Sequence, residues 1–174
     1  LGILVGGEEA EFEAQRALLS TMGKHLYYYG PQGSGALAKL CVNLIAAAQV
    51  ASLAESMALA RKGGLDLRLL AETIRSSPAA STVVTLKTGK IVEGDYRPAF
   101  PLKHMHKDLG LIVRTADALG AAVPVTAAVH QLFTASRTRG HGDEDFVAVL
   151  RLGVVLCAGF GARDLGQRMV YQVD

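Results

Sequence analysis

The stretch from Lys24 to Lys62 decides the fold, and it reads KHLYYYGPQGSGALAKLCVNLIAAAQVASLAESMALARK. The pattern predicts a short strand over 24–29, a glycine-rich turn over 30–35 and a long helix from Ala36 to about Lys62. The helical part is rich in Ala and Leu and poor in β-branched residues, which favours a helix. Because this helix is apolar nearly all round, we expect it to be buried.

Two polar residues interrupt the apolar helix. Lys39 is the only charged residue between Ala36 and Ala54. It lies in the first turn, where the helix dipole disfavours a cation. Asn43 follows four residues later and therefore lies on the same face. A surface lysine whose stem covers apolar groups is the simpler interpretation. A lysine at the mouth of a pocket, placed to polarise a substrate oxygen, is the alternative.

The segment GSGALA over 33–38 imitates the G-x-G-x-x-A dinucleotide fingerprint. It follows a predicted strand and opens a helix, with Glu55 about twenty residues further on. The fingerprint requires that acidic residue at the end of a second strand, whereas Glu55 lies inside a helical pattern. We therefore reject the fingerprint and interpret these glycines as a sharp hinge between strand and helix.

The residues before this stretch predict a β-α-β unit. An apolar run over 1–7 predicts a strand, 8–22 predicts an amphipathic helix with acids at its start, and 24–29 predicts the second strand. Two parallel strands do not form a stable domain by themselves. We therefore interpret 1–33 as the remnant of a larger cofactor-binding sheet.

The residues after the long helix predict further helices over 67–76, 81–86, 102–119, 124–139 and 146–152. A polar loop is predicted over 87–98, and Asp143 is the expected cap before the last helix. The fold class is therefore mainly α, with a helical domain over 34–152. Residues 153–174 carry four glycines and no helical period, so we expect an atypical tail that the fold does not need.

Composition narrows the class of protein. Half of the 174 residues are hydrophobic and the net charge is +2, which predicts a globular protein and argues against nucleic-acid or anionic-membrane partners. The apolar run is too short and too polar for a membrane span. Cys41 and Cys157 lie far apart, so free thiols in a reducing, cytoplasmic compartment are expected. The chain begins at Leu1 rather than Met, and it reads as part of something longer.

Three features stand together: Gly33-Ser34-Gly35 leading to Lys39 and Asn43, Phe100 with Pro101, and Lys107-Asp108-Leu109. Together they resemble the β-hydroxyacid dehydrogenases, which include 3-hydroxyisobutyrate dehydrogenase and the glyoxylate/succinic semialdehyde reductases. The resemblance covers residues 1 to about 152. It implies the end of a Rossmann domain, a long interdomain helix and an all-helical domain that carries the subunit interface of a homodimer or homotetramer.

The resemblance also implies roles for single residues. Lys39 matches the catalytic lysine, and a positioned ammonium can stabilise an alkoxide and relay its proton. The implied substrate-binding residues are Asn43, Gly35 and Phe100, and the implied cofactor-binding residues are Lys107 and Asp108. The cofactor is NAD or NADP, and 3-hydroxyisobutyrate is the favoured substrate. His104 and Asp108 are four apart, but no third ligand has matching spacing, so no metal is expected.

The chain departs from the family pattern in two places. Val42 stands where the family often has a second asparagine, and the stretch 153–174 does not look like the family's end. The family's glycine loop and its substrate-binding serine-glycine segment would precede Leu1, so we expect this chain alone to be a folded, helical oligomer without activity. The alternative function is a non-catalytic helical dimerisation module, which has no use for Lys39.

Overall fold

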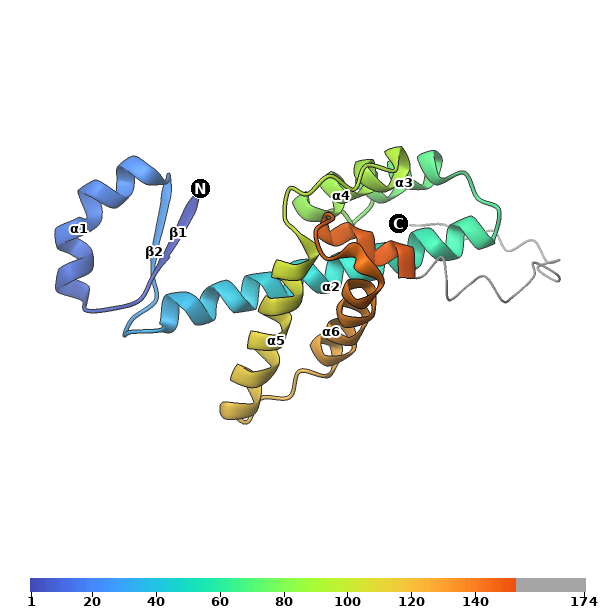
Figure 1. Cartoon of the computed structure of the whole chain (residues 1–174). Coiled ribbons are helices and arrows are strands. Elements are labelled where there is room, and N and C mark those ends of the chain that lie inside the picture. Colours follow the sequence, from blue (N-terminus) through green and yellow to red (C-terminus); the bar gives the residue numbers. More distant parts are fainter. Residues whose placement is uncertain (153–174) are drawn as a thin grey trace.

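The computed structural model describes residues 1–152 and shows a small β-α-β unit joined by one long helix to a helical domain (Figure 1). Strand β1 spans Gly2–Val5, helix α1 spans Glu9–Met22 and strand β2 spans His25–Tyr28. The two strands pair in parallel, from Gly2 opposite His25 to Val5 opposite Tyr28. The predicted mainly α fold with a β-α-β remnant is confirmed.

The β-α-β unit has a very small core. Phe12 is the one residue of α1 that is buried, and its ring stacks on Tyr28 with 5.1 Å between the centroids. The Tyr28 hydroxyl donates a hydrogen bond to the Gly7 carbonyl oxygen at 2.8 Å. Leu18 and Tyr27 remain largely exposed. The unit therefore keeps the apolar surface that a two-stranded sheet cannot cover.

Glycines make the junction between the sheet and the long helix. The backbones of Gly6 and Gly35 pack so closely that a Cβ on Gly6 would lie 2.7 Å from the Gly35 nitrogen. Gly33 precedes the helix with φ +93°, a conformation that favours glycine. A Cβ on Gly35 would likewise lie 2.7 Å from the Leu4 carbonyl oxygen. These glycines therefore allow strand and helix to touch, which agrees with the predicted hinge.

Helix α2, Ser34–Lys62, is the axis of the helical domain. Figure 1 shows α3 and α4 on one side of it and α5 and α6 on the other. The remaining elements are α3 Leu67–Ser76, α4 Thr82–Glu93, α5 Leu102–Ala118, α6 Pro124–Ser136, a π-helical turn at Arg137–His141 and a 3-10 turn at Phe146–Val149.

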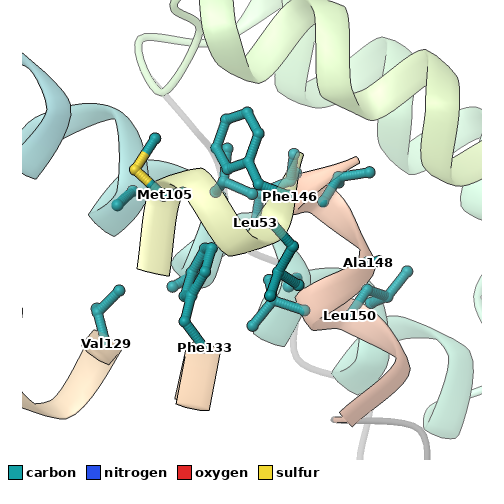
Figure 2. Packing of buried hydrophobic residues seen from close by; sticks show 14 of the residues in the cluster. Leu53, Met105, Val129, Phe133, Phe146, Ala148 and Leu150 are labelled. Atoms are coloured by element: carbon teal, nitrogen blue, oxygen red, sulfur yellow. The ribbon is translucent and has the colours of Figure 1, made fainter. Parts of the chain in front are cut away.

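The core of the helical domain forms where these elements meet (Figure 2). Phe133 of α6 is fully buried, and its ring lies 6.5 Å from that of Phe146. Leu53 of α2 and Met105 of α5 pack into the same cluster. The buried residues of α2 in this cluster begin at Ala47. The core therefore surrounds only the carboxyl-terminal part of α2.

The prediction that α2 is buried along its length is wrong. Toward its amino-terminal end Val42 and Ile45 are 52% and 57% exposed, Cys41 is a free and exposed thiol, and Lys39 is exposed as well. The physical reason is length, since a helix of 29 residues extends roughly 43 Å. The surrounding helices are shorter and cover one end of it.

Helix α2 also meets the length and composition criteria for a membrane span, with a mean hydropathy of 1.6 over its best window. Of that window 28% is buried inside the structure. Core helices meet the same criteria, so this property is weak evidence for a membrane span.

The predicted polar loop over 87–98 is also wrong in its first half, because α4 continues to Glu93. Val84, Lys87, Thr88 and Ile91 are its buried residues, which is the spacing of one helix face. Gly94 ends the helix with φ +68°. The sequence pattern did not reveal this buried face of α4, because one of its buried residues is a lysine.

Candidate functional site

Helices α2 and α5 cross at the edge of the helical domain, and polar side chains from both meet there. Asn43 of α2 is only 5% exposed. Its amide nitrogen Nδ2 donates a hydrogen bond to Asp108 Oδ2 of α5 at 2.7 Å. The two residues are 65 positions apart in sequence. The fold therefore brings a predicted substrate contact and a predicted cofactor contact into direct hydrogen bonding.

Two lysines border this amide–carboxylate pair. Lys107 Nζ lies 3.0 Å from Asp108 Oδ1, with the lysine side chain 63% exposed and that of Asp108 14% exposed. Lys39 is exposed and lies one turn before Asn43 on the same face of α2. The arrangement is a buried amide held by a nearly buried carboxylate, which also pairs with the accessible ammonium of Lys107.

The other two predicted site residues lie elsewhere in this chain. Gly35 lies at the sheet junction, two helical turns and about 12 Å along the axis from Asn43. Phe100 precedes α5, and its ring lies 6.0 Å from the rings of both Phe146 and His104. Phe100 thus packs against the core cluster, partly buried. Roles for both residues stay predictions.

Sequence reasoning missed a second lysine–aspartate pair. Lys87 Nζ lies 2.7 Å from Asp145 Oδ1 and 2.8 Å from Oδ2, and Asp145 is completely buried. The ammonium also lies 4.4 Å from the centre of the Phe146 ring. The backbone nitrogens of Ala99 and Val147 donate further hydrogen bonds to the carboxylate, at 3.0 and 3.1 Å. The one available signal was that Lys87 shares a helix face with apolar residues.

This second pair corrects the predicted cap at Asp143. Asp145, not Asp143, caps the 3-10 turn by accepting the Val147 N–H. Asp143 pairs instead with Lys103 at 2.5 Å on the surface, and this pairing lowers the pKa of the Asp143 carboxyl. Within residues 1–152, no side chain caps the amino-terminal end of α5. The Glu144 carbonyl oxygen accepts the Leu102 N–H there at 2.8 Å and takes the place of a cap.

Metal ligands do not gather anywhere in residues 1–152: no group of three or more His, Cys, Asp or Glu side chains could hold an ion there. His104, four positions before Asp108, lies with its ring 6.0 Å from the Phe100 ring. Lys107 fits part of a dinucleotide site. It offers an accessible cation beside the Asp108 carboxylate, and such a cation can contact a polar or anionic cofactor group.

The family profile described as "NAD-binding of NADP-dependent 3-hydroxyisobutyrate dehydrogenase" matches residues 33–153. The chain belongs to this family.

Curated relatives agree with the profile. The chain is 35% identical over 147 residues to glyoxylate/succinic semialdehyde reductase 2 of Arabidopsis thaliana, which covers 84% of this chain and 41% of the relative. It is 35% identical to mitochondrial 3-hydroxyisobutyrate dehydrogenase of Drosophila melanogaster, over 87% of this chain and 49% of the relative. The chain spans about half the length of the curated relatives it matches.

Solved structures share the fold. A 3-hydroxyisobutyrate dehydrogenase from Salmonella typhimurium superposes with a TM-score of 0.81 at 29% identity, over 86% of this chain and 53% of that one. The Mycobacterium tuberculosis 3-hydroxyisobutyrate dehydrogenase, solved with L-serine, gives a TM-score of 0.77 at 30% identity, over 87% and 54%.

Proposed function

We propose that the protein containing this chain is an NAD(P)-dependent dehydrogenase of small β-hydroxy acids or their semialdehydes, with 3-hydroxyisobutyrate as the favoured substrate. The observation that carries the proposal is the buried Asn43 amide, held by Asp108 at 2.7 Å and lying one turn from Lys39. Family membership supports the reaction class.

Each residue has a chemical task in this proposal. Lys39 takes the proton from the substrate hydroxyl during oxidation and returns it during reduction, and its positive charge stabilises the alkoxide in between. Asn43 binds and orients the substrate with a donor and an acceptor. Lys107 contacts the nicotinamide cofactor, which accepts or donates the hydride when it is bound.

The position of Lys39 supports this task in one further way. It is exposed at the part of α2 that the four shorter helices leave uncovered. A residue there can face a substrate held between this helical domain and a cofactor-binding domain. The buried lysine of the chain, Lys87, has no such access because it is enclosed by Asp145 and Phe146.

The test uses the complete enzyme with saturating cofactor. Lys39→Ala is expected to lower kcat by about 10²- to 10⁴-fold, the usual loss for a positioned acid–base group. Lys39→Arg keeps the charge but holds its proton too tightly to transfer it, so it should also be slow. Lys103→Ala, an exposed lysine of α5 paired only with Asp143 on the surface, is the control and should keep near-normal turnover.

The alternative, a non-catalytic dimerisation module, draws on the exposed apolar residues of α2, Leu37, Val42 and Ile45. The same experiment separates the two functions. A complete protein that turns over no hydroxy acid with either NAD or NADP would favour the module. A Lys39→Ala variant with normal kcat would leave the protein an enzyme but show that Lys39 is not its acid–base group.

A further inference from the structure

Asp108 uses its two carboxylate oxygens for two different partners. Oδ2 accepts the Asn43 amide hydrogen bond at 2.7 Å, and Oδ1 pairs with Lys107 Nζ at 3.0 Å. Asn43 is 5% exposed, whereas the Lys107 side chain is 63% exposed. The lysine can therefore move into solvent, but the asparagine cannot. Of the two partners, Asn43 is the one whose geometry depends on Asp108.

The chemistry of Asp108 decides how the Asn43 amide is turned. The two ends of an asparagine amide have nearly the same shape, so their hydrogen-bond partners determine which end is oxygen and which is nitrogen. A carboxylate that pairs with a lysine accepts hydrogen bonds and donates none. The NH₂ group of Asn43 must therefore face Asp108, and Oδ1 must point away from it.

We propose that Asp108 is a positioning residue, which locks the Asn43 amide so that its second N–H is held in place for an oxygen of the substrate. The proposal rests on the function proposed above. It gives Asp108 a different task from the predicted one, because its carboxylate acts on substrate binding through Asn43 rather than by contact with the cofactor. Its other oxygen pairs with Lys107, which leaves Lys39 as the acid–base group in the proposed reaction.

The fixed orientation of the Asn43 amide has a chemical purpose. A substrate hydroxyl has one proton, and that proton must go to Lys39 during oxidation. The hydroxyl oxygen can at the same time accept the second N–H of Asn43, which stabilises the negative charge that develops there. An amide turned the other way would place Oδ1 of Asn43 against the substrate oxygen, and the two oxygens would repel each other. The orientation of Asn43 therefore decides whether the group binds substrate or rejects it.

The first measurement is a double-mutant cycle in the complete enzyme, with KM for the hydroxy acid determined at saturating cofactor. Asp108→Ala and Asn43→Ala should each raise KM by about tenfold or more, and the double variant should raise it no further. The cofactor Kd of Asp108→Ala should stay within about twofold of the wild-type value. The control is Asp117→Ala, which removes an exposed carboxylate from the same helix and should leave KM unchanged.

Two results of the cycle would overturn the proposal. Independent effects that multiply to about a hundredfold in the double variant would show that Asp108 does not act through Asn43. A weakened cofactor Kd with unchanged KM in Asp108→Ala would make Asp108 a cofactor contact. Failure of the proposed function itself looks different, because then the wild-type protein turns over no hydroxy acid at all.

A second measurement needs no activity. The side-chain NH₂ signals of Asn43, assigned by their loss in Asn43→Ala, should exchange slowly with solvent in the complete wild-type protein because Asp108 holds the group. They should exchange much faster in Asp108→Ala and remain slow in Asp117→Ala. Slow exchange that persists in Asp108→Ala would overturn the lock whether or not the enzyme is active.

Discussion

Two of the lysine–aspartate pairs of this domain, Lys87–Asp145 and Lys107–Asp108, have the same side chains but differ in burial. The Lys87–Asp145 pair has side chains that are 7% and 0% exposed, whereas Lys107 is 63% exposed above an Asp108 that is 14% exposed. Every oxygen of Asp145 is hydrogen-bonded inside the fold. The comparison teaches that burial, not residue type, separates a pair that holds the structure from one that serves a site.

The largest effect is expected from breaking the buried pair. Asp145→Ala leaves the Lys87 ammonium uncompensated and removes the acceptor for the Ala99 and Val147 N–H groups. Removing one partner of a buried pair costs about 3 to 5 kcal/mol of unfolding free energy. Urea unfolding of the complete protein measures it, and a loss below about 1 kcal/mol would contradict the structural role.

Lys87→Met is the matched variant for that experiment. It leaves Asp145 buried but still bonded to backbone N–H groups, so the expected loss is smaller, about 1 to 3 kcal/mol. A loss equal to that of Asp145→Ala would mean that the backbone hydrogen bonds of Asp145 contribute little.

A pair of histidines lies between α5 and α6, where the rings of His106 and His130 are 4.7 Å apart. Burial lowers the pKa of both imidazoles, and the positive charges of Arg137 on both rings and of Arg114 on His130 lower them further. The unfolded chain therefore binds protons more readily, so stability is retained above about pH 6.5 and is lost as the pH falls below it.

The effect is expected as a fall of about a few degrees in thermal midpoint on acidification. Between about pH 7.5 and 5.5 the wild-type midpoint should fall further than that of the double variant His106→Gln, His130→Gln. Glutamine at position 106 can keep the hydrogen bond to the Thr134 hydroxyl that the imidazole makes at 3.0 Å. Parallel pH curves for the two proteins would show that the histidines do not cause the loss.

The smallest effect on stability is expected from the exposed pair. Lys107→Ala should change the unfolding free energy by about 0 to 1 kcal/mol, because the ammonium is largely exposed to solvent and Asp108 keeps its hydrogen bond from Asn43. In the complete enzyme it should weaken cofactor binding more than Asn43→Ala does, while Asn43→Ala raises KM more. Fluorescence titration with NAD and NADP checks this, and equal losses of cofactor affinity in both variants would count against the division.

Some of the candidate site could be predicted from the sequence because it depends on local spacing. Lys39 and Asn43 share a helix face whatever surrounds the helix, since positions four apart are neighbours on any α-helix. The contact between Asn43 and Asp108 could not be predicted this way, because it joins positions 65 apart. Only the crossing of α2 and α5 brings them within 2.7 Å.

Burial was the property that the sequence predicted least well. Composition indicated that α2 is buried along its length and that a polar loop begins at Lys87. In the structure α2 joins the core only from Ala47 onward, and Lys87 lies on the buried face of α4. Hydrophobicity reports what a side chain prefers, whereas burial depends on which elements pack against it. Helix α2 is longer than the helices that pack against it, and Lys87 pairs with a carboxylate that lies 58 positions away in the sequence.

The sequence by itself determined the helices, the hinge at Gly33 and the family to which the chain belongs, because periodicity, glycine conformation and motif spacing are local properties. The tertiary structure alone decided which lysine is enclosed and which remains accessible. It also decided which way the Asn43 amide is turned, since Asp108 reaches it only after α5 has packed across α2. Long-range packing sets the dielectric surroundings and the partners of each polar group, and no local pattern encodes them.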